Sequence, residues 1–277
     1  MSLPTAARPD HQRLGVALAG PGGELLSASA ADDPFYAAST IKLHVLAAVL
    51  RAGDAGLIDL DATQRARRTF TGEGGAPFTL EGDHLDPTHP ADGAPITIRE
   101  LAVRMIDRSS NEATDHLIGL VGLDAVAAVI RDLGLTGTRV ERLIGDASAL
   151  EAGRTNETTA ADLVRTVHAL AVGPLPGTSF ALSDAARAFA RDALAAQRIR
   201  IIADALRPGI PVGSKSGWVD GYRHDVAVIG NPDGPDVRVL AVMTAGIEQG
   251  EADVLIREQV RTLLPDLARM DERTRSD

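Results

Sequence analysis

The hydrophobic pattern of this 277-residue chain changes period along its length, and the order of the changes limits the folds open to it. Five segments have the pattern of β-strands bounded by Gly, Pro or Asp turns: 14–20, 24–30, 212–216, 224–230 and 237–244. Between the second and third of these, apolar residues recur at helical spacing. An amphipathic helix over 251–270 closes the chain. Strands at both ends with helices between them predict an α+β fold built on one antiparallel sheet.

We expect two sub-domains with a cleft between them. Residues 1–36 and 209–277 are predicted to form an α/β part with the sheet and the closing helix, and residues 37–208 an all-α part. Helices are expected in five segments of the inserted block: 39–53, 96–106, 111–133 with a break at Gly122, 158–170 and 183–203. Thr97 and Glu100 have the spacing of a capping box at the start of the second helix. The Gly- and polar-rich stretches are expected as loops: 70–95 and 140–157.

Charge and composition exclude several classes of function. The formal net charge of −10 argues against a nucleic-acid partner, because phosphate binding needs a basic surface. The chain has no cysteine, which excludes disulfides and thiol chemistry. No apolar run reaches the length of a membrane span, and no signal peptide precedes Leu14. We expect a monomer that acts on a small molecule and needs neither a metal nor a cofactor. The protein is expected to be cytoplasmic as the chain stands, or secreted if a leader has been removed.

Lysine is rare in this chain. Of the 28 lysine and arginine residues only Lys42 and Lys215 are lysines, so arginine supplies the ordinary surface charge. Arginine is not deprotonated in proteins, whereas the pKa of a lysine falls readily on burial. A site that needs an amine base would therefore retain lysine. Both lysines also lie next to serines, which makes chance a poor explanation.

The first lysine belongs to the pattern Ser39-x-x-Lys42. At the start of a helix, positions i and i+3 lie on one face, so the hydroxyl and the amine would come within hydrogen-bond reach. A neutral amine could then take the serine proton and generate a nucleophile. The alternative is that Ser39 caps the helix while Lys42 is solvated. The pattern alone is common, so the choice depends on the rest of the chain.

Two further polar segments follow in order, Ser109-Ser110-Asn111 between helices and Lys215-Ser216-Gly217 on a strand. Each is ordinary by itself. Together with STIK at 39–42, they resemble the S-x-x-K, S-D-N and K-T-G or K-S-G motifs of the class A β-lactamases and, more broadly, of the penicillin-recognising serine hydrolases. The resemblance covers about residues 14–270. Four flanking segments also match the family: 37–43, 59–61, 97–101 and 156–160.

This resemblance implies a fold of the class A β-lactamase type and an active site between the two sub-domains. It implies that Ser39 is acylated by a β-lactam or a related amide or ester, with Lys42 as the base. The N–H groups of Ser39 and Trp218 would form the oxyanion hole. Ser109 would pass a proton to the departing nitrogen, and Lys215 would hold Ser109 and supply positive charge.

The resemblance also implies a set of substrate-binding residues. Asn111 would bind the side-chain amide of the substrate. Ser216 and Gly217 belong to the strand along which the substrate would lie. Ser216, together with Arg223 or His224 on the next strand, is expected to anchor a substrate carboxylate.

Two departures from the family pattern bear on the mechanism. Ser110 replaces an Asp that is mainly structural in the family. The family's Ω-loop carries a Glu that positions the water for hydrolysis of the acyl-enzyme. Residues 138–142 resemble the start of that loop, but Ile144 stands at the position of the Glu. Asp146 and Glu151 are the nearest following carboxylates; each is a candidate replacement base, with a solvated loop charge as the alternative.

At the neck of the same loop, Arg142 and Asn156 replace an Arg–Asp pair, so we expect a hydrogen bond in place of a salt bridge. Acylation is therefore predicted more firmly than deacylation. Two alternatives stay open: an esterase or peptidase that uses the same acyl-serine, or a penicillin-binding sensor that remains acylated.

Histidines outside the motifs have simpler interpretations. His84, Asp86 and His89 lie close together, and a metal site is conceivable, but no second cluster supports it and a polar loop is favoured. His44 is expected to be packed rather than catalytic, because Lys42 already supplies a base.

Overall fold

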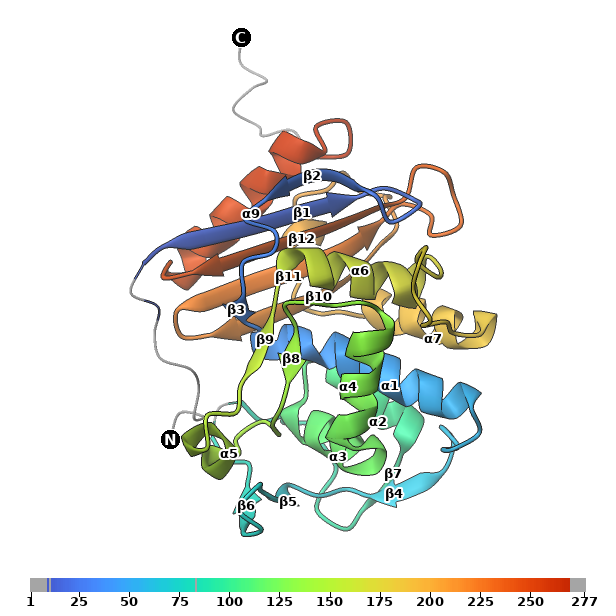
Figure 1. Cartoon of the computed structure of the whole chain (residues 1–277), viewed down its shortest axis with the longest axis vertical. Helices are drawn as coiled ribbons and strands as arrows, with labels where there is room; N and C mark the ends of the chain where they lie inside the picture. The colour runs from blue at the N-terminus through green and yellow to red at the C-terminus, as the bar shows by residue number, and fades with distance from the viewer. Residues whose placement is uncertain (1–8, 10, 83, 270–277) are drawn as a thin grey trace.

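The computed structural model describes residues 9, 11–82 and 84–269, which Figure 1 shows as a sheet with helices on both sides and a helical region beneath it. Five strands form one antiparallel sheet in the order β10-β11-β12-β1-β2. They are β1 (Arg13–Ala19), β2 (Leu25–Ser29), β10 (Val212–Val219), β11 (Tyr222–Ile229) and β12 (Arg238–Ala245). Because β1 pairs with β12 along its whole length, the two ends of the chain build one sheet, as the sequence predicted.

Both faces of the sheet are buried along most of β1 and β12, which explains the nearly continuous apolar runs of these two strands, whereas the edge strand β2 is largely exposed. Alternate side chains point to opposite faces. Leu18 and Val242 belong to one core, which α8 (Ile201–Asp204) and α9 (Gln249–Leu263) cover. Ala17 and Met243 belong to the larger core on the other face, against which α6 (Ala160–Ala171) and α7 (Asp184–Ala195) pack.

Helix α1 (Lys42–Asp54) runs through the centre of the helical region (Figure 1). Its residues from Lys42 to Leu50 are all buried, so it lacks a solvent face over that stretch. The helices around it are α2 (Ile98–Asp107), α3 (Asn111–Val121), α4 (Leu123–Asp132), α6 and α7. Gly122 separates α3 from α4 with φ 81°, a left-handed conformation that favours glycine.

A test for membrane-spanning helices finds no single one long and apolar enough among the described residues; only α3 and α4 taken together reach that length and composition, and they are bent by 85°.

The predicted helices and strands are largely confirmed, with two differences in the second half. The helix expected over 183–203 is broken into α7 and α8, because residues between them are tied to α2. Gln197 donates to the Ile106 carbonyl at 2.9 Å, and the Arg198 N–H donates to the Asp107 carbonyl at 2.9 Å. The closing helix ends at Leu263, two residues before Pro265, which cannot continue a helix; Met270 lies outside the described residues.

The chain between residues 35 and 208 also contains short strands that the sequence did not predict. One small sheet joins β3 (Phe35–Tyr36), β9 (Asn156–Thr158) and β8 (Arg139–Val140). Two hairpin-like pairs join β4 (Thr63–Arg65) to β7 (Pro95–Thr97) and β5 (Thr69–Thr71) to β6 (Pro77–Thr79). The expected surface loop over 70–95 is therefore wrong in part, since Asp86 and His89 inside it are buried. The division into sub-domains at residues 36 and 208 stays a prediction.

Candidate active site

Ser39 lies in a short 3₁₀ turn, η1 (Ala38–Ile41), that leads directly into α1. Ser39 is half-buried, and Lys42, the first residue of α1, is fully buried. The N-cap residues of η1 and α1 are Ala37 and Ile41, so Ser39 does not cap either element. The turn therefore leaves the Ser39 hydroxyl available for chemistry rather than for local structure.

Lys42 is held inside the protein by oxygen atoms from the Ser-Ser-Asn segment. Its Nζ donates to the Ser109 carbonyl at 2.6 Å, to Ser109 Oγ at 3.0 Å and to Asn111 Oδ1 at 2.7 Å. Burial lowers the pKa of Lys42 well below its usual value, and the positive charge of Lys215 lowers it further. A lysine in this state can exist as a neutral amine and accept a proton.

Ser109 is the point on which both lysines converge. Lys215 Nζ donates to Ser109 Oγ at 3.1 Å and to the Ser216 carbonyl at 2.7 Å. Burial lowers the pKa of Lys215 to about 7, although the charge of Asp225 opposes the shift. Ser109 itself has φ 60°, a left-handed conformation that costs energy in a residue with a side chain. The strained backbone between α2 and α3 thus presents one hydroxyl to two cations.

Asn111 links Lys42 to the neighbouring chain segment. Its Nδ2 donates to the His84 carbonyl at 3.1 Å, while its Oδ1 accepts from Lys42. Ser110, between Ser109 and Asn111, caps α3 by accepting from the Ala113 N–H at 3.2 Å. The Ser-Ser-Asn segment is therefore a helix cap and part of the site at once.

A cavity of about 260 Å³ opens beside these groups. It brings together five of the residues predicted to react with or bind a substrate: Ser39, Ser109, Asn111, Ser216 and Trp218. The rest of its lining consists of Tyr36, Ala38, His84, Leu85, Arg108, Arg142, Ile144, Gly145, Asn156, Ile199 and Val219. Among residues 9, 11–82 and 84–269, no aspartate or glutamate is part of this lining, although the protein carries a net charge of −10.

Strand β10 lies directly against η1 at this cavity. A Cβ atom on Gly217 would stand 3.1 Å from Thr40 Cγ2 and 3.2 Å from the Ala37 carbonyl oxygen, so glycine permits the close approach. Trp218 follows on the strand with 43% of its surface exposed, and its ring centroid lies 6.2 Å from that of His84. Trp218 on β10 and His84 on the segment before α2 both line the cavity.

Arg223 and His224 are not part of this cavity lining, and the expectation that one of them anchors a carboxylate stays a prediction. Arg223 forms a two-bond ion pair with Asp253 of α9, at 2.6 and 3.1 Å. His224 is buried, accepts from the Thr244 N–H at 3.2 Å and donates to the Tyr36 carbonyl at 2.9 Å. Burial lowers the pKa of His224 to about 4.

Neither candidate replacement base in the Ω-loop-like segment lines the cavity. Asp146 caps the short helix α5 (Ala147–Glu151), accepting from Ser148 Oγ at 2.6 Å and from the Glu73 N–H at 2.8 Å. Burial raises the pKa of Asp146, but these hydrogen bonds outweigh burial and lower it overall. Glu151 is exposed at the end of α5. Ile144 does line the cavity, so an apolar side chain stands where the family has its Glu.

The predicted hydrogen bond at the loop neck is present, between the Asn156 side chain and the Arg142 backbone. Asn156 Oδ1 accepts from the Arg142 N–H at 3.3 Å, and Nδ2 donates to the Arg142 carbonyl at 3.1 Å. The Arg142 guanidinium instead reaches Tyr36, donating to its hydroxyl at 2.9 Å.

Sequence reasoning missed several cavity residues, among them His84 and Arg108. The direct adjacency of Arg108 to Ser109 was a usable signal, whereas nothing in the sequence connects His84 to the motifs. His84, Asp86 and His89 do not gather as a metal site, and no group of three or more His, Asp or Glu side chains suited to a metal ion occurs among residues 9, 11–82 and 84–269. His44 is buried and packed, with Nε2 3.2 Å from Thr166 Oγ1.

Comparisons with known proteins agree with this arrangement. The sequence profile of the β-lactamase enzyme family matches residues 18–265. A β-lactamase structure from Sphaerobacter thermophilus superposes with a TM-score of 0.74 at 29% identity, covering 93% of this chain and 94% of that one. A variant of the last common ancestor of the Gram-negative class A β-lactamases gives a TM-score of 0.72 at 26% identity and 92% coverage of each chain. The expected fold of the class A β-lactamase type is confirmed.

One curated relative is named a β-lactamase of Rhodobacter capsulatus. It is 29% identical over 174 residues, a match that covers 61% of this chain and 56% of that protein. The similarity to this relative therefore extends over little more than half of its length.

Proposed function

Since this chain belongs to the β-lactamase enzyme family and is by fold a serine-type hydrolase, we propose that it opens β-lactam amides through an acyl-enzyme formed on Ser39. One observation carries the proposal: two buried lysines, on α1 and β10, meet at the Ser109 hydroxyl beside a cavity that Ser39 lines. Such a set supplies a nucleophile, an amine that can lose its proton, a hydroxyl relay and a cation.

In the proposed reaction, Lys42 in its neutral form takes the proton of Ser39, and Ser39 Oγ bonds to the lactam carbonyl carbon. The oxyanion is stabilised by the N–H groups of Ser39 and Trp218. The C–N bond then breaks, and the nitrogen receives a proton through Ser109, which Lys42 reprotonates. The bonds from Lys42 and Lys215 to Ser109 Oγ, at 3.0 and 3.1 Å, support this route.

Hydrolysis of the acyl-enzyme is proposed to be the slow half of the cycle. A water molecule needs a base near the ester, and the described part of the cavity lining offers Ile144 and no carboxylate. This observation favours a second candidate function, a penicillin-binding or sensing protein that stays acylated on Ser39. The same acyl-serine chemistry would also serve an ester or peptide substrate.

The test is to follow a chromogenic cephalosporin by absorbance in stopped flow, with wild-type protein and with Ser39→Ala. A burst of one equivalent followed by a slow steady state would support acylation with slow release. Multiple turnovers without a burst would favour an efficient hydrolase. If neither the cephalosporin nor an activated ester reacts in a Ser39-dependent manner, the proposed function fails.

A further inference from the structure

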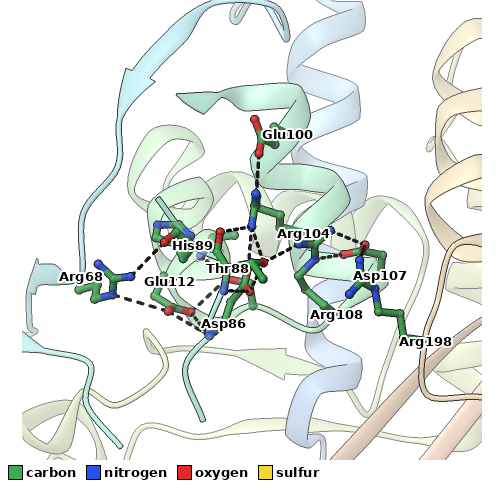
Figure 2. Close-up of polar contacts among 12 residues, drawn as sticks. Arg68, Asp86, Thr88, His89, Glu100, Arg104, Asp107, Arg108, Glu112 and Arg198 are labelled. Carbon is green, nitrogen blue, oxygen red and sulfur yellow. Dashed lines mark hydrogen bonds and ion pairs between the residues drawn. The ribbon is translucent and has the colours of Figure 1, made fainter. Parts of the chain in front are cut away.

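Residues 84–89 contribute one wall of the cavity, and a network of charged side chains around Asp86, Thr88 and His89 holds this segment (Figure 2). His84 and Leu85, at the start of this segment, line the cavity. The rest of the segment packs against α2 and α3, where Arg104 donates to Asp86 Oδ2 and to the Thr88 carbonyl, each at 2.9 Å. The position of the wall thus depends on contacts made two to five residues further along the chain.

Glu112 of α3 is the deepest member of this network. It is fully buried, and both of its carboxylate oxygens accept from the Asp86 N–H, at 3.1 and 3.2 Å. Oε2 also accepts from Ser110 Oγ at 3.0 Å, and Arg68 Nε lies 3.9 Å from Oε1 (Figure 2). Burying a carboxylate is costly unless it is hydrogen-bonded, so these contacts are the reason that the site tolerates Glu112.

The position of Glu112 bears on the departure at Ser110. The middle motif of the family has a carboxylate at this point, and here a hydroxyl replaces it. Glu112, two residues later, brings a carboxylate back to the same turn, and Ser110 Oγ bonds directly to it. Ser110 and Glu112 thus place a buried carboxyl group, hydrogen-bonded to a hydroxyl, beside Ser109 and Asn111.

A short chain of hydrogen bonds runs from Glu112 to the reacting groups. Glu112 fixes the backbone at Asp86; two residues earlier, the His84 carbonyl accepts from Asn111 Nδ2 at 3.1 Å. Asn111 Oδ1 in turn accepts from Lys42 Nζ at 2.7 Å. Displacement of the wall would therefore move the amide of Asn111, the residue that the family resemblance implies as the partner of the substrate's side-chain amide.

We propose that Glu112 is a positioning residue for the substrate: through the Asp86 N–H it holds the wall at 84–89 and so orients Asn111, in place of the missing carboxylate at Ser110. The proposal rests on the function proposed above for the part that concerns substrate binding. Its structural part, the anchoring of residues 84–89, is independent of any reaction.

The experiment compares Glu112→Ala with Glu112→Gln, the double variant Ser110→Asp/Glu112→Ala and the control Glu100→Gln. Glu100 belongs to the same network but is exposed, and its carboxylate accepts from Arg104 at 2.7 and 2.9 Å. Hydrogen–deuterium exchange of residues 84–89 is measured by mass spectrometry without substrate. KM and kcat are measured for a penicillin with an amide side chain, and the acylation rate for the small ester p-nitrophenyl acetate.

We expect Glu112→Ala to accelerate exchange in 84–89 and to raise KM for the penicillin by about tenfold or more, while ester acylation changes by less than about twofold. Glu112→Gln keeps one acceptor oxygen, so its exchange rate in 84–89 and its KM for the penicillin should lie between those of wild type and Glu112→Ala. The double variant should recover most of the loss, and Glu100→Gln should resemble wild type.

Unchanged exchange in Glu112→Ala would overturn the proposal. Equal losses with penicillin and ester, or no recovery in the double variant, would reduce Glu112 to a merely structural residue and equally overturn it. If wild-type protein reacts with neither compound, the proposed function fails, and the exchange measurement still decides whether Glu112 anchors the wall.

Discussion

Installing a carboxylate at position 144 should convert slow deacylation into fast deacylation. Ile144 lines the cavity together with Ser39, so a Glu side chain there would add a carboxylate to a lining that has none among the residues that the structure describes. A general base contributes about 10²–10⁴-fold to a proton-transfer step. We expect the lower end, about 10²-fold, because the position of the new carboxylate has not been adjusted for the water.

The backbone next to Ile144 determines how the variant must be built. Asp115 Oδ1 accepts from the Ile144 N–H at 2.8 Å, and burial raises the pKa of Asp115 well above its usual value. Burial already favours the protonated form of Asp115, and ionising a Glu at position 144 as well would cost about 4 kcal/mol at a separation of about 4 Å and an effective dielectric constant of about 20. In Ile144→Glu alone the two carboxyl groups would therefore share a proton. Asp115→Asn removes the like charge and retains an oxygen that accepts from the Ile144 N–H.

The assay forms the acyl-enzyme with excess penicillin, removes free compound and follows recovery of the unmodified mass with time. Four proteins are compared with wild type: Ile144→Glu, Asp115→Asn, Ile144→Glu/Asp115→Asn and the isosteric control Ile144→Gln/Asp115→Asn. The double Glu variant should release the acyl group fastest. If it is no faster than the Gln control, a missing carboxylate is not what limits deacylation, and the reasoning from Ile144 is refuted.

Three further predictions concern the lysines and a buried histidine. Lys42→Arg keeps the positive charge but cannot lose it, so Ser39 acylation in stopped flow should slow by about 10²-fold or more; an unchanged rate would remove Lys42 as the base. Because the pKa of Lys215 is lowered to about 7, its charge is present below that pH and is lost as pH rises through it. KM for a penicillin should therefore rise above pH 7 by up to about tenfold per pH unit, while KM for its methyl ester, which lacks the carboxylate, stays constant. If KM for both compounds changes equally with pH, Lys215 does not bind the substrate carboxylate. The ring signals of His224, whose pKa is about 4, should keep their neutral positions from pH 8 to pH 5 in an NMR titration, and a midpoint near 6.5 would contradict its burial.

The sheet and most helices could be predicted because their signals are local. Strand alternation at both chain ends is visible in the sequence, and the break between α3 and α4 follows from Gly122 alone. The Thr97–Glu100 pattern likewise gives a real cap, with Thr97 Oγ1 accepting from the Glu100 N–H at 3.1 Å. In each case the residues that decide the structure are close together in the sequence.

The parts that could not be predicted depend on partners far apart in the chain. Segment 84–89 looked like a solvated loop because Glu112 and Arg104, which bury it, belong to helices that begin later. Arg223 looked available to a substrate because its partner Asp253 is 30 residues away on α9. In both cases the deciding contacts are tertiary pairings of charges, which composition and periodicity do not encode.

Several of the motif residues lie together in the structure, and their chemical roles remain proposals. Ser39, Ser109 and Asn111 line one cavity, and both lysines bond to Ser109. Asp146, offered as a base from its sequence position, is instead the cap of α5. Sequence spacing identifies which residues can lie close together in a site. Only the structure shows when a side chain is instead engaged in capping a helix.

The most direct test of the central claim is intact-protein mass spectrometry at short times after mixing with a penicillin. Opening of the lactam by Ser39 loses no atoms, so we predict a gain equal to the whole mass of the penicillin. This adduct should map to the peptide that contains Ser39, persist for longer than its formation time and be absent from Ser39→Ala. An adduct of the same mass in Ser39→Ala, or its localisation to another peptide, would contradict the account.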